Sequence, residues 1–430
     1  MALTGRLGLL ALLGALVVGL LVPSGTGVVA VLAVLLVLVA VDLALAGSVR
    51  ALRFSRAGTT SVRLGEPAEV TLTVTNPGRR TVRGLLRDAW PPSAGAADRH
   101  RIAVPAGERR AFTTRLLPTR RGDRPAVRVT VRALGPLGLA ARQGSHAVPW
   151  SVRVLPPFHS RKHLPSRLAR LQQLDGRNAV LIRGQGTEFD SLREYVIGDD
   201  VRSIDWRASA RASDVMVRTW RPERDRHLVL VLDTGRVSAG RVGDAPRLDA
   251  AMDAALLLAA LASRAGDRVD LLAYDRRLRA AVPGSSATTL LPSLVNAMAP
   301  LEPSLIETDA RGLVSEILRR TRRRALVVLL TGLDPAPLEE GLFPVLGSLT
   351  SRHEVIVASV ADPRVEEMAR GRGDAEAVYA AAAAERTMAE RASAVAQLGR
   401  RGVGVVDAVP EELPPALADR YLALKAAGRL

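Results

Sequence analysis

The chain has 430 residues, of which 48% are hydrophobic and 24% charged, and it contains no cysteine. This length and apolar content suit two or three folded domains and exclude a disordered protein, while the lack of cysteine excludes disulfides, thiolate metal ligands and cysteine nucleophiles. The formal net charge of +17 comes almost wholly from arginine, and aromatic residues make up only 3% of the chain. We therefore expect no nucleic-acid partner, because base stacking needs aromatic side chains among the basic ones.

Two apolar runs dominate the N-terminal residues 1–56. Residues 7–22 and 28–46 can each form a helix that crosses a membrane, and an uncharged turn joins them. The first run is only just long enough, so we expect residues 2–4 to extend its helix. The pattern predicts a two-span transmembrane hairpin.

Arginines at both ends of the hairpin predict its orientation. Arg6 precedes the first run, and Arg50, Arg53 and Arg56 follow the second. By the positive-inside rule both ends and every later domain lie in the cytoplasm, with the hairpin in the plasma membrane. A cleaved signal peptide is the alternative, but a second apolar run follows at once and no small-residue cleavage site is evident before Pro23.

Residues 57–155 show the period-two alternation of β-strands. The clearest stretch runs from Glu69 to Thr75 and ends at the turn sequence Asn76-Pro77-Gly78. Four further short runs have the same character: 101–104, 111–117, 127–133 and 151–155. Their spacing predicts a small β-sandwich with immunoglobulin-like topology, which would be a spacer or binding module.

A basic connector over residues 156–226 leads to a region, 227–430, in which strands and helices alternate. Buried strands are predicted over 227–232, 269–273, 325–330, 354–360 and 403–406, with 278–282 as an antiparallel partner of the second. Helices are predicted over 247–264, 286–299, 309–320, 374–399 and 412–427. The alternation indicates an α/β domain with a doubly wound, mostly parallel sheet, whose ligands would bind at the carboxyl ends of the strands.

The connector contains the densest mixture of charged and apolar side chains in the sequence. We interpret it as a segment wrapped on the sheet domain, with docked apolar side chains, arginines paired with carboxylates and a turn at Gly198. The side chains expected in this network are Glu188, Phe189, Arg193, Tyr195, Gly198, Asp199, Asp200, Arg202, Asp205, Trp206 and Arg211. A metal or acid–base cluster of Asp199, Asp200 and Asp205 is the alternative, which the equal density of arginines disfavours.

This segment resembles the signature of the bacterial domain of unknown function 58 family. The shared motifs are glycine-x-glycine-x-glutamate-phenylalanine at 184–189, leucine-arginine-x-tyrosine at 192–195, glycine-aspartate-aspartate at 198–200 and isoleucine-aspartate-tryptophan at 204–206. The likeness extends to residues 135–139 and 266–274. The resemblance implies a membrane-anchored protein with a von Willebrand factor A-like domain after the signature and a MoxR-type AAA+ ATPase as partner. It implies no established reaction.

Domains of the von Willebrand factor A type often hold magnesium through aspartate-x-serine-x-serine after the first strand, a later threonine and an aspartate after the fourth strand. Here Asp233 fills the first position, but Gly235 and Val237 replace the serines, and the fourth strand ends in Thr331-Gly332 without an aspartate. The degenerate set that remains is Asp233, Asp334 and a threonine at 288 or 289, with Thr288 taken as the candidate. We expect no metal or other cofactor, with Mg²⁺ as the ion if one binds, and Asp233 as a cap of the following loop.

These patterns predict a membrane-tethered, non-enzymatic interaction or assembly protein that works with a MoxR-type AAA+ ATPase. The ATPase rests on the resemblance alone. Two alternatives stay open: a metal-dependent enzyme or metal-dependent adhesion module at Asp233, and a binder of anionic lipids driven by arginine.

Overall fold

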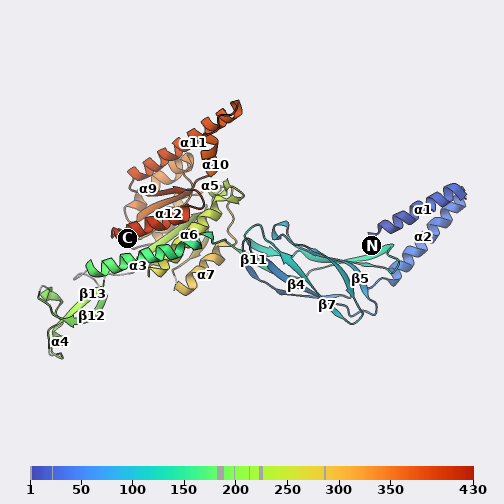
Figure 1. Ribbon diagram of the computed structural model, residues 1–430, viewed down its shortest axis with the longest axis horizontal. Helices are drawn as coiled ribbons and strands as arrows, with labels where there is room; N and C mark the ends of the chain where they lie inside the picture. The colour runs from blue at the N-terminus through green and yellow to red at the C-terminus, as the bar shows by residue number, and fades with distance from the viewer. Residues whose placement is uncertain are drawn as a thin grey trace. The chain divides into compact units, whose positions relative to one another are not determined.

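The computed structural model of the protein describes residues 2–21, 23–181, 188–197, 199–212, 214–221, 226–284 and 287–430. The chain divides into two compact units, Met1–Leu155 and Pro156–Leu430, and each is taken by itself below. In Figure 1 the first unit runs from blue to teal and the second from green to red.

The first unit begins with two apolar helices that pack along one another (Figure 1). Helix α1 spans Gly5–Leu21, and helix α2 spans Gly25–Leu45. The hydroxyl of Ser24 caps α2 by accepting the N–H of Gly27 at 3.2 Å. By length and composition α2 can cross a membrane, whereas α1, with 17 residues, is shorter. This places an apolar helix suited to a membrane near the N-terminus.

The residues before α1 form a strand and not a further helical turn. Strand β1 (Ala2–Leu3) pairs antiparallel with β10 (Ala140–His146), and Thr4 donates its N–H to Leu139 O at 3.1 Å and its hydroxyl to Gly138 O at 2.7 Å. The prediction that residues 2–4 extend the first helix is wrong. An open sheet edge offers hydrogen-bond partners that the first turn of a helix lacks.

Three sheets make up the rest of this unit, and their strands pair antiparallel except β3 and β11, which are parallel. A five-stranded sheet has the order β1-β10-β9-β5-β6, and two three-stranded sheets have the orders β2-β4-β7 and β3-β11-β8. The strands are β2 (Arg53–Gly58), β3 (Ser61–Arg63), β4 (Ala68–Thr75), β5 (Val82–Ala89), β6 (Arg99–Val104), β7 (Arg109–Leu116), β8 (Gly122–Pro125), β9 (Arg128–Leu134) and β11 (Ser151–Leu155). Leu72 and Val74 of β4 share one core with Leu86 of β5 and Val131 of β9, so the sheets face each other across buried aliphatic side chains.

Asp42 of α2 fastens the helical hairpin to the sandwich. Its carboxylate is fully buried, and it accepts the N–H groups of Leu137 at 2.7 Å, Leu139 at 2.7 Å and Ala140 at 2.8 Å. A Cβ atom at Gly135 would collide with this carboxylate, so the loop closes on Asp42 only with glycine there. Residues 135–139, which are part of the family resemblance, therefore form a loop that binds the Asp42 carboxylate near the end of α2.

Arg56 lies inside the sandwich and not at its surface. Its guanidinium pairs with buried Asp88 and lies 5.2 Å from the ring centroid of Trp90, whose indole N–H also bonds Asp88. Arg56 therefore cannot serve as the membrane-flanking charge that the sequence indicated, because a buried, paired cation does not face lipid.

The second unit is built on a six-stranded sheet with the order β18-β17-β14-β19-β20-β21. Its strands are β14 (His227–Asp233), β17 (Arg268–Tyr274), β18 (Leu278–Val282), β19 (Leu326–Leu330), β20 (Glu354–Val360) and β21 (Gly404–Ala408). All neighbours are parallel except β17 and β18, as predicted.

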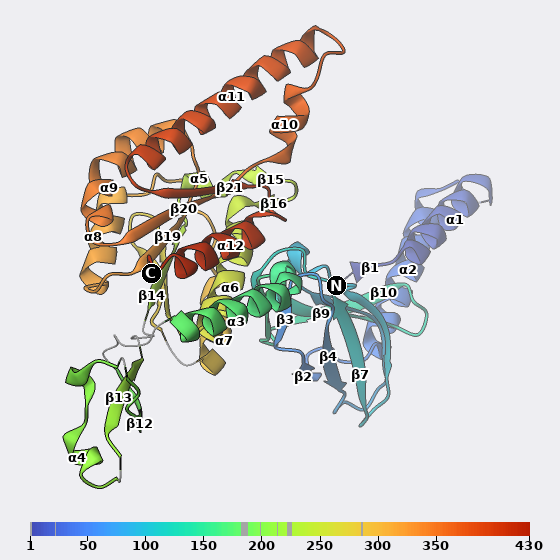
Figure 2. The same ribbon diagram turned by 60° about the vertical axis from the view of Figure 1, so that its left-hand side comes forward.

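Helices cover both faces of this sheet (Figure 2). One face packs against α6 (Arg247–Arg264) and α12 (Leu413–Ala426), with α3 (Leu164–Leu181) and α7 (Ala287–Met298) on α6. The other face packs against α8 (Ala310–Arg320), α9 (Phe343–Thr350) and α11 (Ala375–Arg400). The second unit is thus an α/β layer structure, which the alternating apolar runs predicted.

Two buried aspartates fasten peripheral segments to this core. Asp253 of α6 accepts the N–H and hydroxyl of Ser160, which lies in the short helix η2 (His159–His163). Asp267, before β17, accepts the ammonium of Lys425 at 3.0 Å and the hydroxyl of Tyr421, both from α12. Buried carboxylates need such donors because an unpaired buried charge is strongly destabilising.

Replacing Asp42 tests the hairpin clamp. Asp42→Ala leaves three main-chain N–H groups without their acceptor, at about 1–3 kcal/mol each, so we expect a loss of about 3 kcal/mol or more from the folding of this region. Hydrogen exchange of the full chain in detergent should show faster exchange at residues 137–140. The matched control is Asp98→Ala, which removes only an exposed pair with Arg87 and should leave that exchange unchanged. Equal exchange in both variants would contradict the clamp.

Candidate functional site

The carboxyl ends of β14 and β19 bring together the chemical groups of the second unit. The buried aliphatic run of β14 ends at Asp233, which is only 6% exposed, and β19 is followed by Thr331. Thr308 arrives from the loop before α8, whose first turn is capped by Asp309 through the N–H of Gly312. Three segments distant in sequence therefore meet at one edge of the sheet, where open α/β sheets bind ligands.

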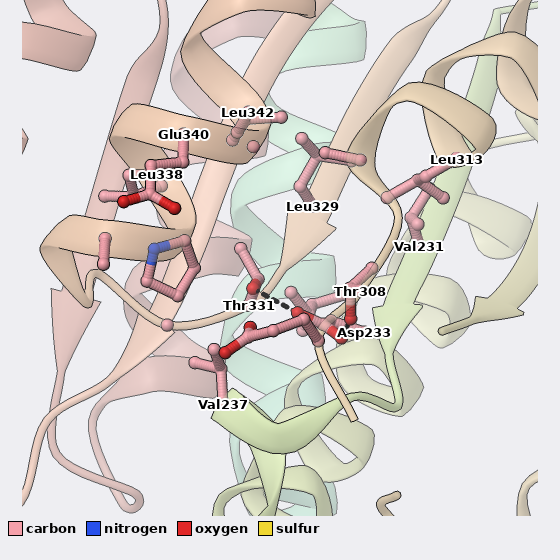
Figure 3. A pocket seen from close by; sticks show the side chains of 17 residues that line it. Val231, Asp233, Val237, Thr308, Leu313, Leu329, Thr331, Leu338, Glu340 and Leu342 are labelled. Atoms are coloured by element: carbon pink, nitrogen blue, oxygen red, sulfur yellow. Dashed lines mark hydrogen bonds between the residues drawn. The ribbon is translucent and has the colours of Figure 1, made fainter. Parts of the chain in front are cut away.

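Hydroxyl and main-chain donors surround the Asp233 carboxylate (Figure 3). Its Oδ1 accepts the N–H of Gly235 at 2.8 Å and the hydroxyl of Thr308 at 2.5 Å, and its Oδ2 accepts the hydroxyl of Thr331 at 2.6 Å. Burial raises the pKa of Asp233, and these three hydrogen bonds oppose the rise without cancelling it. The folded protein therefore favours the neutral form of this acid more than water does.

These contacts do not fit a magnesium ion. Mg²⁺ demands an octahedral shell of oxygen ligands, but the two threonine hydroxyls here direct their hydrogens at the Asp233 carboxylate. A Cβ atom at Gly235 would collide with the Thr308 hydroxyl, so a serine could not enter this position without displacing that threonine. Among the residues that the structure describes, no three His, Asp or Glu side chains are grouped to hold a metal.

The structure assembles a different set around Asp233 from the one expected. Thr288 lies in α7, and Asp334 accepts the guanidinium of Arg247 at 3.3 Å. Thr308, 75 residues along the chain, contacts Asp233 instead. The sequence offered no periodic signal for Thr308, because it lies in a loop whose path depends on the packing of α8.

A cavity of about 240 Å³ opens beside this cluster. Asp233, Thr308 and Thr331 lie together on one side of it, and many of the other lining side chains are aliphatic (Figure 3). One wall is a π-helix, η4 (Pro337–Leu342), and the remaining wall residues include Val231, Val237, Leu313 and Leu329. π-Helical turns are rare and occur frequently at functional sites.

The signature segment forms a second, separate cluster. Strands β12 (Glu188–Glu194) and β13 (Met216–Arg221) pair as an antiparallel hairpin, and its connection carries helices η3 (Val201–Ser203) and α4 (Trp206–Ser209). We call residues 188–221 the signature module. Residues 182–187, the predicted turn at Gly198 and the side chains of Glu188 and Phe189 lie outside what the structure describes.

The aspartates of the signature module act as caps and turn acceptors. Asp199 accepts Arg193 at 2.5 Å and the N–H of Val196 at 3.0 Å. Asp200 caps η3 through the N–H of Arg202, and Asp205 caps α4 through two N–H groups and accepts Arg218 at 2.8 Å. The N–H of Ala208, followed by the Arg218 guanidinium, lowers the pKa of Asp205.

Two expectations about this module need correction. Within the described part of the module the ion pairs are Arg193–Asp199 and Arg218–Asp205, so the predicted pairing of Arg202, Arg207 and Arg211 with carboxylates is not found there. Two of the apolar side chains expected to dock are exposed instead, Ile197 at 96% and Trp206 at 68%, while Tyr195 is half-buried. Main-chain N–H groups compete for the carboxylates because they are fixed close by, whereas arginine must order a long side chain.

Comparison with known proteins gives a family likeness without a function. The model of the family described as "Protein of unknown function DUF58" matches residues 191–395. Uncharacterized proteins of Mycobacterium bovis and Mycobacterium tuberculosis are each 29% identical to the chain over 198 residues. The match covers 45% of this chain and 61% of each relative, so the chain spans about three fifths of their length.

One solved structure is similar to a smaller part of the chain. The CARDB domain of a Pyrococcus furiosus protein shares 17% identity with it, over 24% of this chain and 86% of that domain. The TM-score is 0.19, which is too low for this likeness to bear on the fold.

Asp233→Asn tests the electrostatic state of the buried acid. Because the folded pKa is raised above the ordinary value of 3.8, the stability due to Asp233 is fully present below that pH and is lost as pH rises through the folded pKa. Asparagine does not ionise, so the variant should gain stability over the wild type as the pH is raised. Urea midpoints at several pH values measure this gain, with the fully exposed Asp244→Asn as control. A difference between variant and wild type that does not vary with pH would contradict it.

Asp205→Ala tests the caps of the signature module. The change removes the two N–H contacts at the start of α4 and the partner of Arg218, so this turn should open more often. We expect trypsin to cleave after Arg207 and Arg211 several-fold faster in the folded variant. Asp214→Ala, an exposed change in the same module, should leave the cleavage rate as it is.

Proposed function

We propose that the chain is a membrane-tethered, non-enzymatic interaction or assembly protein that works with a MoxR-type AAA+ ATPase. In this proposal α1 and α2 both span the plasma membrane, the sandwich is immunoglobulin-like, and residues 227–430 form a von Willebrand factor A-like domain in the cytoplasm. The sheet order with one antiparallel edge strand and helices on both faces supports that fold.

The attachment of the hairpin supports the two-span arrangement. Strand β1 before α1 pairs with β10, and Asp42 near the end of α2 bonds the loop that leads into the same strand. Both ends of the hairpin are therefore held by one domain. If α2 crosses the membrane, α1 must cross it in the opposite direction. Arg6, Arg50 and Arg53 remain as exposed charges that favour the cytoplasmic side.

The chemistry of the two clusters supports a role without turnover. Asp233 is hydrogen-bonded by two threonine hydroxyls and a main-chain N–H, and none of these three donors is an acid or base that could exchange a proton with it near neutral pH. Asp199, Asp200 and Asp205 cap turns and helices. Acids used in this way stabilise local structure, and a catalytic acid needs access to a substrate.

The observation that carries the proposal is the exposed apolar surface of the signature module. Ile197 and Trp206 are exposed, together with Val196 and Val201. Asp199 and Asp205 of the same module already accept hydrogen bonds. Exposed tryptophan and aliphatic side chains grouped on a small module are typical of protein-binding surfaces. A partner protein would cover them at a gain of apolar contact.

Photo-cross-linking tests this function. A photoreactive residue placed at 197 or 206 of the full chain, in its native membrane, should yield adducts that mass spectrometry identifies as an AAA+ ATPase. Position 379 is the matched control, because Tyr379 is 78% exposed but lies on α11. Repeated recovery of no ATPase, or equal recovery from position 379, would count against the proposal.

A further inference from the structure

The cavity beside Asp233 has the size of one long side chain. Its volume of about 240 Å³ lies below the roughly 300–1,000 Å³ of pockets that hold drug-sized molecules and cofactors. Its walls are aliphatic, with Val231, Leu329 and Leu342 among them. The occupant therefore needs an apolar stem and cannot be as large as a nucleotide.

Three side chains with oxygen acceptors lie together in the lining of this cavity. A carboxylate offers about four lone-pair positions, and the three hydrogen bonds to Asp233 leave one free, on Oδ2. The hydroxyls of Thr308 and Thr331 donate to Asp233 and keep acceptor lone pairs of their own. All three side chains line the cavity and lie together in Figure 3. This part of the cavity accepts hydrogen bonds and suits a group with several donors.

The charge of the cavity selects a cation. In a chain with net charge +17, the cavity is lined by Asp233, Glu307 and Glu340. Arg236 pairs with Glu307, whereas within the described residues Glu340 takes part in no ion pair. Both glutamates are exposed, so they lie where an incoming charge would meet them first. An anion would be repelled here, and a cation would be drawn inward.

The wall that carries Glu340 is a π-helix, which is an irregular form of helix that often occurs at functional sites. Five of the six residues of the π-helix Pro337–Leu342 line the cavity: Pro337, Leu338, Glu340, Gly341 and Leu342. A π-helical turn widens the helix locally and is less favourable than regular helix. Here that turn presents a glutamate and two leucines to the same space.

We propose that this cavity binds the side chain of a lysine presented by a partner protein. The ε-ammonium donates its three N–H groups to Asp233, Thr308 and Thr331, and the methylene stem packs on the aliphatic walls. A tetrahedral ammonium matches three neighbouring acceptors better than the planar fork of arginine does. The ammonium group of the lysine then lies beside Asp233, at the position that does not suit a metal ion. The site deepens the proposed function and rests on it for the existence of a partner.

The lysines of this chain narrow the choice of occupant. The sequence has two, and Lys425 is buried against Asp267 and Tyr421. A second copy of the chain can therefore offer only Lys162, which is exposed in η2. The occupant we commit to is a lysine of a different protein, and Lys162→Arg separates it from a second copy.

The test uses n-butylammonium as the analogue of the lysine side chain. Saturation-transfer NMR on the full chain in nanodiscs should show it binding, and n-butyrate, which has the same stem and the opposite charge, should not bind. Affinity should rise as the pH rises through the folded pKa of Asp233, because the ionised carboxylate is the stronger acceptor. Equal binding of n-butyrate would overturn the proposal.

Two variants and one control make the test specific to the site. Asp233→Asn should weaken n-butylammonium binding at least about tenfold and abolish its pH dependence, since a charge-assisted hydrogen bond is lost. Ala310→Leu fills the cavity from α8 and should remove binding altogether. Asp244→Asn should bind like the wild type. Wild-type affinity in Asp233→Asn would overturn the proposal even if Ala310→Leu failed to fold.

The partner itself is tested by cross-linking through a photoreactive residue at exposed position 340, with Lys162→Arg as the second arm. Adducts with a different protein that persist in Lys162→Arg support the proposal, whereas adducts with a second copy that vanish in it overturn the choice of partner. The n-butylammonium experiment needs no partner protein. If n-butylammonium binds but no ATPase is cross-linked, the ATPase partner is rejected and the lysine site is kept. If an ATPase is cross-linked but n-butylammonium does not bind, only the lysine site is rejected.

Discussion

The carboxylate of Asp42 is fully buried at the end of an apolar helix, and three main-chain N–H groups satisfy it. A buried carboxylate without donors would be strongly destabilising, so the loop that supplies them is held to the helix. The same constraint recurs where Asp253 holds η2 and where Asp267 holds α12. In each case a short acidic side chain joins segments that are distant in sequence, which makes these acids the junctions of the fold.

Asp233 is a buried carboxylate as well, but most of its hydrogen-bond donors can themselves accept further hydrogen bonds. Its donors are mostly hydroxyls, which both donate and accept, so the oxygens around it remain open to a further donor. The main-chain donors around Asp42 cannot accept in return. Of these two satisfied acids, Asp233 also lines a cavity.

The signature module is held together by local contacts of its own aspartates. Its aspartates fix turns and helix starts, and its apolar residues are left at the surface. Local caps hold a small hairpin in one shape, and a rigid, exposed tryptophan then offers contact area with little loss of conformational entropy. In the function proposed above, this surface is the part of the module that a partner protein contacts.

Local periodicity by itself predicted the six strands of the large sheet and helices such as α6, because these elements carry regular apolar patterns. It gave no prediction for α9 or α10 (Pro363–Ala369). It missed β5 and β10, whose alternation is broken by arginine and glycine. Only the tertiary structure decided that Ala2–Leu3 joins a sheet, that Arg56 is buried and that Thr308 bonds Asp233. The physical reason is that hydrogen-bond partners 32 or more residues away leave no trace in a local pattern, whereas the burial of a regular helix or strand does.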